Sequence, residues 1–310
     1  MSQHRIGVIA GLVSYVIWGL FPLFWPLVEP AGAPEILAHR ILWSLAFLVV
    51  VLVFTAGFRW LRTVGRRRFL QLAVAAALIT VNWGVFIYAV NNDHVVDSAL
   101  GYYINPLVSV ALGLVVLHEH LRPRQRVAVL IGLLAVVVLT VEYGKPPWIA
   151  LILACSFGTY GLVKKQVGLD GTQSLFVETA ILVVPALAYI VVAGLKGTAT
   201  FTADDLGHSM LLMAGGVVTA VPLILFGAAA IRIPLSTIGL MQYIAPTMHF
   251  VIGVAIYGEA MPAGRVAGFV LVWIALIVLT VDALGTLRPR NVIPVAPVPA
   301  RVRSAAPPDA

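Results

Sequence analysis

The sequence has little charge for its length. Only 11% of its 310 residues are Asp, Glu, Lys or Arg, whereas about 25% is usual in a soluble globular protein. Its charged side chains are too few to cover the surface of a soluble chain of this size, which excludes soluble enzymes, nucleic-acid-binding modules and disordered proteins. Cysteine is nearly absent as well, and the single Cys155 excludes an intramolecular disulfide.

Apolar residues take the place of the missing charge. They make up 61% of the chain, and the mean hydropathy is +1.00. A membrane-spanning helix needs about 20 apolar residues, so ten need about 200 and leave roughly 110 for connections and tails. We therefore expect an all-α integral membrane protein with ten transmembrane helices. The segments are Ile6–Leu27, Pro34–Thr55, Phe69–Asn91, Ser98–Leu117, Arg124–Val141, Trp148–Lys164, Ser174–Ala193, Ser209–Ile231, Ser236–Tyr257 and Gly264–Leu284.

The positions of Lys and Arg predict the orientation. Sixteen of the 20 lie on one set of connections and at the two termini, and only Lys145, Lys196 and Arg265 lie on the other. Cytoplasmic loops carry the excess of basic residues, so both termini should face the cytoplasm of a cell (inner) membrane. The formal charge of +7 therefore indicates orientation rather than nucleic-acid binding. Residues 286–310, rich in proline and arginine, should form a disordered cytoplasmic tail.

The chain also repeats itself. Asn105-Pro106 matches Ala245-Pro246 and Glu119 matches Glu259, each 140 residues apart. These matches predict two five-helix units, residues 1–143 and 144–285. Because five is odd, the second unit must be inserted upside down, as in the inverted repeats of many secondary transporters.

Eight stretches include polar and aromatic residues that hydropathy alone would not demand. They are Trp18–Leu23, Glu35–Ser44, Asn82–Gly84, Ala89–Asn92, Leu100–Leu107, Val218–Leu223, Pro234–Thr237 and Gln242–Thr247. The sequence resembles the EamA-type drug/metabolite transporters, and most closely their RarD branch, which is linked by name to chloramphenicol. The resemblance implies ten helices in two inverted five-helix repeats and a transport function. It leaves the substrate open, and His118 departs from the Gly that such proteins commonly have before the glutamate.

Arg40 is the one basic residue within an expected span. A charge at that depth is costly unless it is paired or reaches water. It could line an outward-facing cavity and attract an anionic or zwitterionic substrate group. Alternatively, it could form a structural ion pair with Asp93 or Asp97. Both readings stay open.

Four titratable residues are candidates for proton coupling. Glu35 and His39 are four residues apart and share a helix face, which suits either a proton relay or an interfacial hydrogen bond. Glu178 could take up and release a proton, or could pair with Lys164 or Lys165. His249 can titrate near physiological pH, although an interhelical hydrogen bond is the more ordinary role of such a residue.

Amides and aromatic residues at helix-core depth complete the candidate substrate site. The amides could join helices or hydrogen-bond a substrate in a central cavity, with the aromatic side chains as its walls. Pro106 and Pro246 fall at corresponding places in the two halves, and paired interruptions of this kind point to a transporter's binding site. The candidates are Trp18, Arg40, Asn82, Trp83, Tyr102, Asn105, Gln242 and Tyr243.

Taken together, these features predict a secondary transporter or exporter of small organic molecules, such as drugs or metabolites, that is coupled to protons and works by alternating access. No cofactor or metal is expected, and the partners are a small-molecule substrate and the lipid bilayer, with the chain as a monomer or homodimer. The alternatives are a membrane-embedded enzyme acting on lipids, which would need a clustered reactive set, and a channel, which would need a ring of like polar residues. The sequence shows neither pattern.

Overall fold

A computed structural model describes residues 2–91, 95–143 and 148–256, together with Gly258 and short pieces between 266 and 282. Within these ranges every regular element is a helix. The elements of the first half are α1 (Gln3–Gly19), α2 (Phe21–Phe24), η1 (Trp25–Val28), α3 (Ala33–Phe54), η2 (Arg59–Thr63), α4 (Arg66–Asn91), α5 (Val95–Val116) and α6 (Pro123–Tyr143). Those of the second half are α7 (Trp148–Val167), α8 (Gly171–Leu195), α9 (Leu206–Ala230), α10 (Leu235–Met241) and α11 (Ile244–Ala255).

The first nine expected segments all coincide with helical structure, but two of them are interrupted. The first is bent by 40° between Gly19 and Phe21, just before Pro22. The ninth divides into α10 and α11 at Gln242 and Tyr243, ahead of Pro246. By contrast, α5 continues through Pro106. The expected matching interruptions are therefore present at Pro246 and absent at Pro106, and most of the tenth segment lies outside the described residues.

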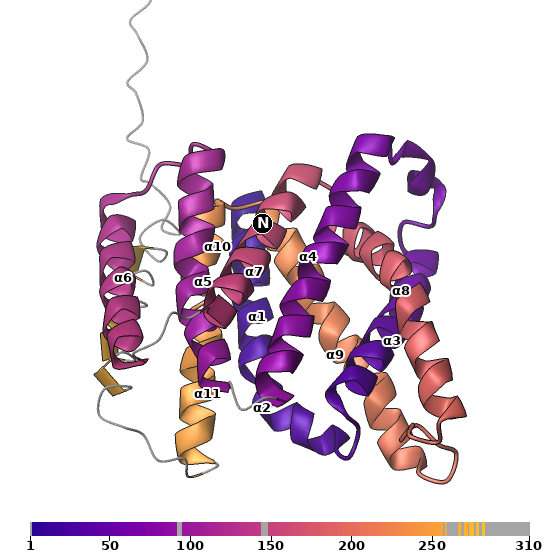
Figure 1. Cartoon of the computed structure of the whole chain (residues 1–310). Coiled ribbons are helices and arrows are strands. Elements are labelled where there is room, and N and C mark those ends of the chain that lie inside the picture. The colour runs from indigo at the N-terminus through magenta and orange to yellow at the C-terminus, as the bar shows by residue number, and fades with distance from the viewer. Residues whose placement is uncertain are drawn as a thin grey trace, which may run out of the picture.

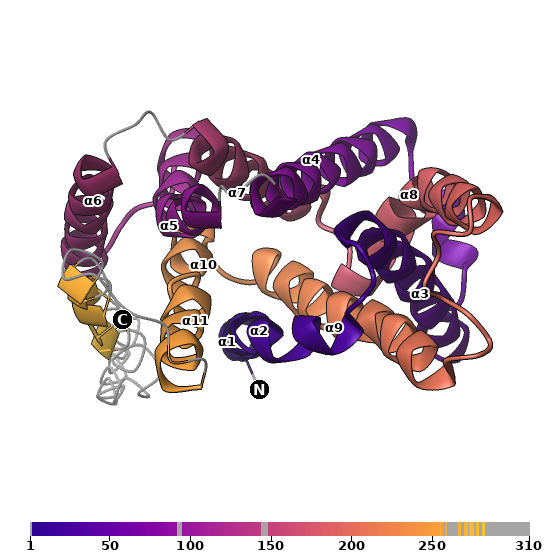
Figure 2. The ribbon, with the colours of Figure 1, turned by 60° about the horizontal axis from the view of Figure 1, so that its bottom comes forward.

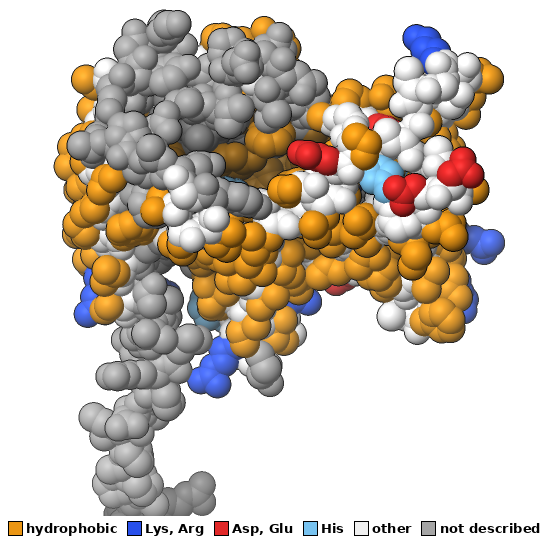
Figure 3. All heavy atoms as spheres, turned by 90° about the horizontal axis from the view of Figure 1, so that it is seen from below, with side chains coloured by type: hydrophobic (Ala, Val, Ile, Leu, Met, Phe, Trp, Pro, Cys, Tyr) orange, Lys and Arg blue, Asp and Glu red, His pale blue; other side chains and the backbone are white. Residues whose placement is uncertain are grey.

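The outer surface of the helices is apolar. Within the described ranges, four helices are each long and apolar enough to cross a membrane, and the bent pair of α1 with α2 and η1 adds a fifth. Large apolar side chains project outward from them, such as Phe54 at 83% and Leu195 at 85% exposed. Seen from the end at which α1 finishes, hydrophobic side chains cover the sides of the molecule (Figure 3). Such an apolar outer surface is suited to contact with the lipid of a membrane.

Helices from the two halves pack against each other (Figures 1 and 2). In the first half, α3 packs on α8 and α9, and α4 packs on α7 and α8. In addition, α5 contacts α7 and α10, and α1 contacts α9 and α11. The α6 helix lies at the edge, against α5. The centre of the molecule is therefore built jointly by helices from the two halves of the sequence.

One close approach between the two halves is that of α3 to α9, at Gly216. A Cβ atom added at Gly216 would lie 2.6 Å from the backbone nitrogen of Ser44. The Ser44 hydroxyl donates a hydrogen bond of 2.8 Å to the Gly216 carbonyl, so the two backbones are held together at this point. Small residues at helix contacts allow such close packing in membranes.

We predict that Gly216→Ala lowers the thermal unfolding temperature of the purified protein, because overpacking of a tight contact costs about 1–3 kcal/mol. Gly84 is the matched control, since a Cβ added there meets nothing within 4 Å. Gly84→Ala should leave the unfolding temperature unchanged or raise it slightly. Equal behaviour of the two variants would contradict the packing of α3 on α9.

Candidate functional site

A cavity of about 360 Å³ lies where the two halves meet. It is placed toward the ends at which α1 finishes and α3 and α5 begin. Its walls are rich in aromatic side chains and include residues from α1, α2, η1, α3, α4, α5, α7, α9 and α11. The aromatic and polar residues that line it are Tyr15, Trp18, Phe21, Trp25, Arg40, Asn82, Trp83, Phe86, Tyr102, Asn105, Phe157, Thr219, Gln242 and His249.

Arg40 is held between two indole rings in this cavity. Its guanidinium carbon lies 4.7 Å from the ring centroid of Trp25 and 4.8 Å from that of Trp83. Its Nε donates a hydrogen bond of 2.8 Å to the hydroxyl of Thr219, which itself donates to the Gly215 carbonyl at 2.7 Å. This chain of hydrogen bonds fixes the plane of the guanidinium. It leaves the two terminal nitrogens without a hydrogen-bond partner in the described part of the chain.

The charge of Arg40 is stabilised mainly by the two rings. No carboxylate among the described side chains lies within ion-pair distance of it. A cation on an aromatic face gains about 2 kcal/mol when it is desolvated, which is less than a buried charge costs. The side chains of Asp93 and Asp97, the partners that the sequence offers, lie outside the described residues. The geometry therefore leaves the donor face of Arg40 available to a ligand that enters the cavity.

Seven of the eight substrate-binding candidates line the cavity, and Tyr243 does not. Tyr243 is buried instead against α5 and α6, where its hydroxyl lies next to Gly132. Gln242 and Tyr243 both have right-handed helical backbone angles, so these neighbouring side chains point in different directions, Gln242 into the cavity and Tyr243 toward α5 and α6.

Two of the lining amides also join helices. Asn82 donates from α4 to the Leu153 carbonyl at 2.9 Å and to the Ser156 hydroxyl at 3.0 Å, both on α7. Gln242 donates from the end of α10 to the Ser109 hydroxyl on α5 at 3.2 Å. Asn82 and Gln242 therefore each join two helices and line the cavity at the same time.

Trp25 and Thr219, which both contact Arg40, are among the lining residues that the sequence did not suggest as site residues. Trp25 reaches the cavity because the chain bends after Gly19, and hydropathy shows no sign of this bend. Thr219 has a repeat counterpart in Thr80, 139 residues earlier. That match is a signal from which its importance could have been inferred.

Of the four titratable candidates, only His249 lines the cavity. Its Nε2 lies 3.0 Å from the Trp18 carbonyl oxygen, and its ring meets the ring of Tyr102 edge-on at 6.2 Å. The imidazole therefore joins α11 to α1, as an interhelical donor would, while it also borders the space that a ligand would fill.

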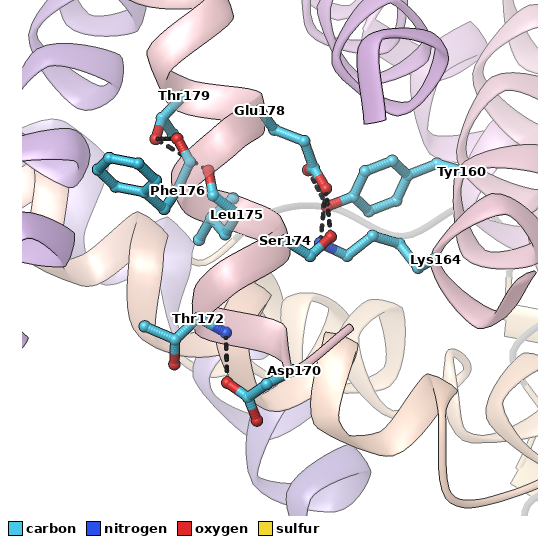
Figure 4. A network of polar contacts seen from close by, with 9 residues as sticks. All are labelled: Tyr160, Lys164, Asp170, Thr172, Ser174, Leu175, Phe176, Glu178 and Thr179. Atoms are coloured by element: carbon cyan, nitrogen blue, oxygen red, sulfur yellow. Dashed lines mark hydrogen bonds and ion pairs between the residues drawn. The ribbon is translucent and has the colours of Figure 1, made fainter. Parts of the chain in front are cut away.

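Glu178 lies in a buried ion pair near the C-terminal end of α7 and the N-terminal end of α8 (Figure 4). The Lys164 ammonium is 2.7 Å from its Oε1, and both side chains are 1% exposed. The carboxylate also accepts hydrogen bonds from the hydroxyls of Tyr160 at 2.9 Å and Ser174 at 2.8 Å. Lys165, the other partner considered, points elsewhere, toward Glu119 at 3.6 Å and the Ile233 carbonyl at 2.6 Å.

Glu35 and His39 hold the connection between α8 and α9. The Glu35 carboxylate accepts from the backbone nitrogens of Thr200 at 2.7 Å and Phe201 at 3.3 Å. The His39 ring stacks on Phe201 at 4.7 Å and accepts from the Trp43 indole at 3.3 Å. Among the described hydrogen bonds none joins Glu35 to His39, so this arrangement fits an anchor for the loop better than a relay.

Removing one partner of the buried pair should be far more harmful than removing both. We predict that Glu178→Ala destabilises the protein by about 3–5 kcal/mol, because it leaves the Lys164 ammonium buried and unpaired. The double variant Lys164→Met with Glu178→Leu should recover most of the unfolding temperature. Lys165→Met is the control for a lysine in a partly exposed pair and should have a small effect. A double variant as unstable as Glu178→Ala would refute this account of the pair.

The sequence of this chain is similar to those of known transporters. Residues 5–141 match the EamA-like transporter family. Over 289 residues the chain is 53% identical to "Protein RarD" of Streptomyces exfoliatus, which covers 93% of this chain and 92% of that protein. It is also 43% identical over 284 residues to "Uncharacterized transporter YojE" of Bacillus subtilis, with 90% and 95% of the two chains covered.

A solved crystal structure of another protein has a similar fold. It superposes with a TM-score of 0.66 at 16% sequence identity and covers 91% of this chain and 100% of its own. At this level of identity the likeness concerns the fold alone.

Proposed function

Because the chain belongs to the EamA-like transporter family, and within it to the RarD proteins, we propose that this multi-pass membrane transporter is a secondary transporter that moves small organic molecules by alternating access. The observation that carries the proposal is the cavity of about 360 Å³ between the halves, with its aromatic side chains and the half-buried cation of Arg40. Its size is within the range of about 300–1,000 Å³ that is typical of small-molecule sites.

The helix packing supports a ten-helix fold of two inverted repeats. In such a fold α1, α3, α4 and α5 correspond to α7, α8, α9 and α10 with α11. The contact of α1 with α9 then has its counterpart in α7 with α4, and that of α3 with α9 in α8 with α4. The contacts of α3 with α8 and of α5 with α10 map onto themselves. In this proposal both termini face the cytoplasm, and reporter fusions after Arg68 and near Lys196 should report opposite sides of the inner membrane.

The distribution of polar contacts supports an outward-facing state. The cavity lies toward the side that the Lys and Arg count assigns to the outside. On the opposite side, the Lys164–Glu178 pair closes α7 against α8. Glu119 accepts from the Leu235 and Ser236 nitrogens at 2.8 and 3.0 Å, and so ties the loop after α5 to the start of α10. Alternating access would require these cytoplasmic contacts to open when the outer side closes.

The chemistry of the cavity favours a substrate with a carboxylate on an aromatic or apolar body. A carboxylate can accept two parallel hydrogen bonds from a guanidinium, and the free terminal nitrogens of Arg40 offer such a pair. The rings of Trp18, Phe86 and Phe157 provide an apolar wall for the rest of the molecule. Thr219 acts as a positioning residue, because it holds the guanidinium and leaves its outer edge free.

We predict that Arg40→Gln and Arg40→Lys weaken binding of small aromatic carboxylates to the purified protein by about tenfold or more, since a charged hydrogen bond contributes about 1.5–3 kcal/mol. Lysine should substitute poorly because it lacks the planar fork. Thr219→Val should weaken binding less and leave the unfolding temperature near that of the wild type.

Binding and thermal unfolding are measured on the same samples. Lost affinity in normally stable variants supports the binding role of Arg40. Unchanged affinity with lower stability would instead favour a structural ion pair with Asp93 or Asp97.

For proton coupling we propose His249 in preference to the three other titratable candidates. His249 borders the cavity, whereas three donors already surround the Glu178 carboxylate, and Glu35 and His39 hold the connection between α8 and α9. We expect His249→Asn to abolish uptake driven by a proton gradient in proteoliposomes while substrate exchange continues. Glu178→Gln is the comparison. Gradient-driven uptake that survives His249→Asn but fails in Glu178→Gln would transfer the role to Glu178.

A further inference from the structure

A cluster of arginines lies at the cytoplasmic start of α4. Five arginines fall between positions 59 and 68, and the sequence has no acidic residue between Glu35 and Asp93. All five side chains are exposed. None of them makes an ion pair or a side-chain hydrogen bond in the described part of the chain. This surface therefore carries a concentrated positive charge that the protein itself does not neutralise.

Two apolar grooves flank the first turns of α4, and Arg66 lines both of them. Each has a volume of about 540 Å³. The first groove lies between α4, η2 and α8, and the second between α4 and α7. The first is lined by Leu61, Val64, Arg66, Phe69, Phe176, Val177, Ala180 and Ile181. The second is lined by Arg66, Arg67, Leu70, Gln71, Val74 and Val163.

Along α4 the charged side chains come first and the apolar side chains follow, in the same order as the headgroup and the acyl chains of a phospholipid. Arg66 and Arg67 begin the helix, whereas Phe69, Leu70 and Val74 lie within the following two turns and are about half exposed. Val74 is about 12 Å further along the helix axis than Arg66, at 1.5 Å per residue. That distance separates the phosphate level of a leaflet from the upper part of its hydrocarbon chains. A charged end and an apolar wall thus follow each other in the direction of the membrane normal.

We propose that the start of α4 is a binding site for an anionic phospholipid of the cytoplasmic leaflet. Arg66 and Arg67 hold the headgroup phosphate, and the acyl chains lie in the two grooves. The backbone N–H groups at the start of α4 add positive potential at the same place. A free phosphate ion would leave the grooves empty, and a zwitterionic lipid would bring its own cation close to the arginines. The site depends on the membrane location of the chain and not on the transport function.

The arginines also orient the protein in the membrane, and that role requires only their number and side. A lipid site requires particular arginines as well. Arg59 and Arg62 belong to the same cluster but line neither groove. Replacing Arg66 and Arg67 removes the same amount of charge as replacing Arg59 and Arg62. A different effect of the two double variants on lipid binding would therefore indicate a specific site, and an equal effect would indicate a general electrostatic attraction.

The test is native mass spectrometry of the full-length protein, released from membranes that contain phosphatidylglycerol and phosphatidylcholine in equal amounts. The wild type should retain phosphatidylglycerol in preference to phosphatidylcholine. The double variant Arg66→Gln with Arg67→Gln should reduce retained phosphatidylglycerol about thirtyfold, because each basic residue near an anionic surface contributes about 1 kcal/mol and about 1.4 kcal/mol corresponds to a factor of ten. The control Arg59→Gln with Arg62→Gln should retain it nearly as well as the wild type.

A further variant, Ala180→Trp, fills the first groove without changing any charge and should also lower retention. The unfolding temperature of each variant is measured as well, so that lipid retention is compared only between equally stable proteins. Replacing the exposed arginines is not expected to change the unfolding temperature. Equal losses in the two arginine pairs, or equal retention of the two lipids by the wild type, would overturn the proposal. Displacement of the lipid by millimolar inorganic phosphate would also overturn it, since it would show an anion site that does not use the grooves.

Discussion

A guanidinium keeps its charge at any physiological pH, so Arg40 cannot escape the cost of its position by losing a proton. The structure meets this constraint with two indole rings, one hydroxyl and a cavity. Several features of the fold depend on that solution. The bend after Gly19 brings Trp25 over the cation, α4 supplies Trp83, and the close packing of α9 on α3 brings Thr219 within hydrogen-bond distance. The cation and the shape of the cavity are therefore determined together.

Glu178, Lys164 and Glu119, in contrast to Arg40, find all their partners within the protein. Glu178 and Lys164 neutralise each other and are surrounded by hydroxyl donors, so they can remain at a dry helix contact. Glu119 is satisfied by backbone nitrogens at the start of α10. A satisfied charge holds helices together, whereas a charge with free donors can bind a ligand. This contrast is the physical basis of our proposal that the cytoplasmic side closes while the cavity recognises the substrate.

Much of this organisation could be predicted from the sequence, because lipid imposes simple rules. Apolar run length located the helices, and depth in the membrane singled out Arg40, Asn82 and His249. The pairing of Glu178 with one of two neighbouring lysines was an open alternative, and only the rotation of α7 against α8 selects Lys164. Trp25 and Tyr243 could not be placed from the sequence. Trp25 lies beyond the bend after Gly19, which hydropathy does not register. Tyr243 adjoins the cavity-lining Gln242 in the sequence, and only the packing of its ring against α5 and α6 shows that it points away from the cavity.

The most direct test of the central claim compares ligands that differ only in charge. Aromatic carboxylates and their methyl esters are titrated into the purified wild-type protein, with the fluorescence of its tryptophans as the signal, because two of the indoles contact Arg40. If the free donors of Arg40 recognise an anion, the acids change the fluorescence in a saturable way and the esters do so only at much higher concentration. Esters that bind as tightly as the acids would show that the cavity recognises an apolar body and that Arg40 has no part in it.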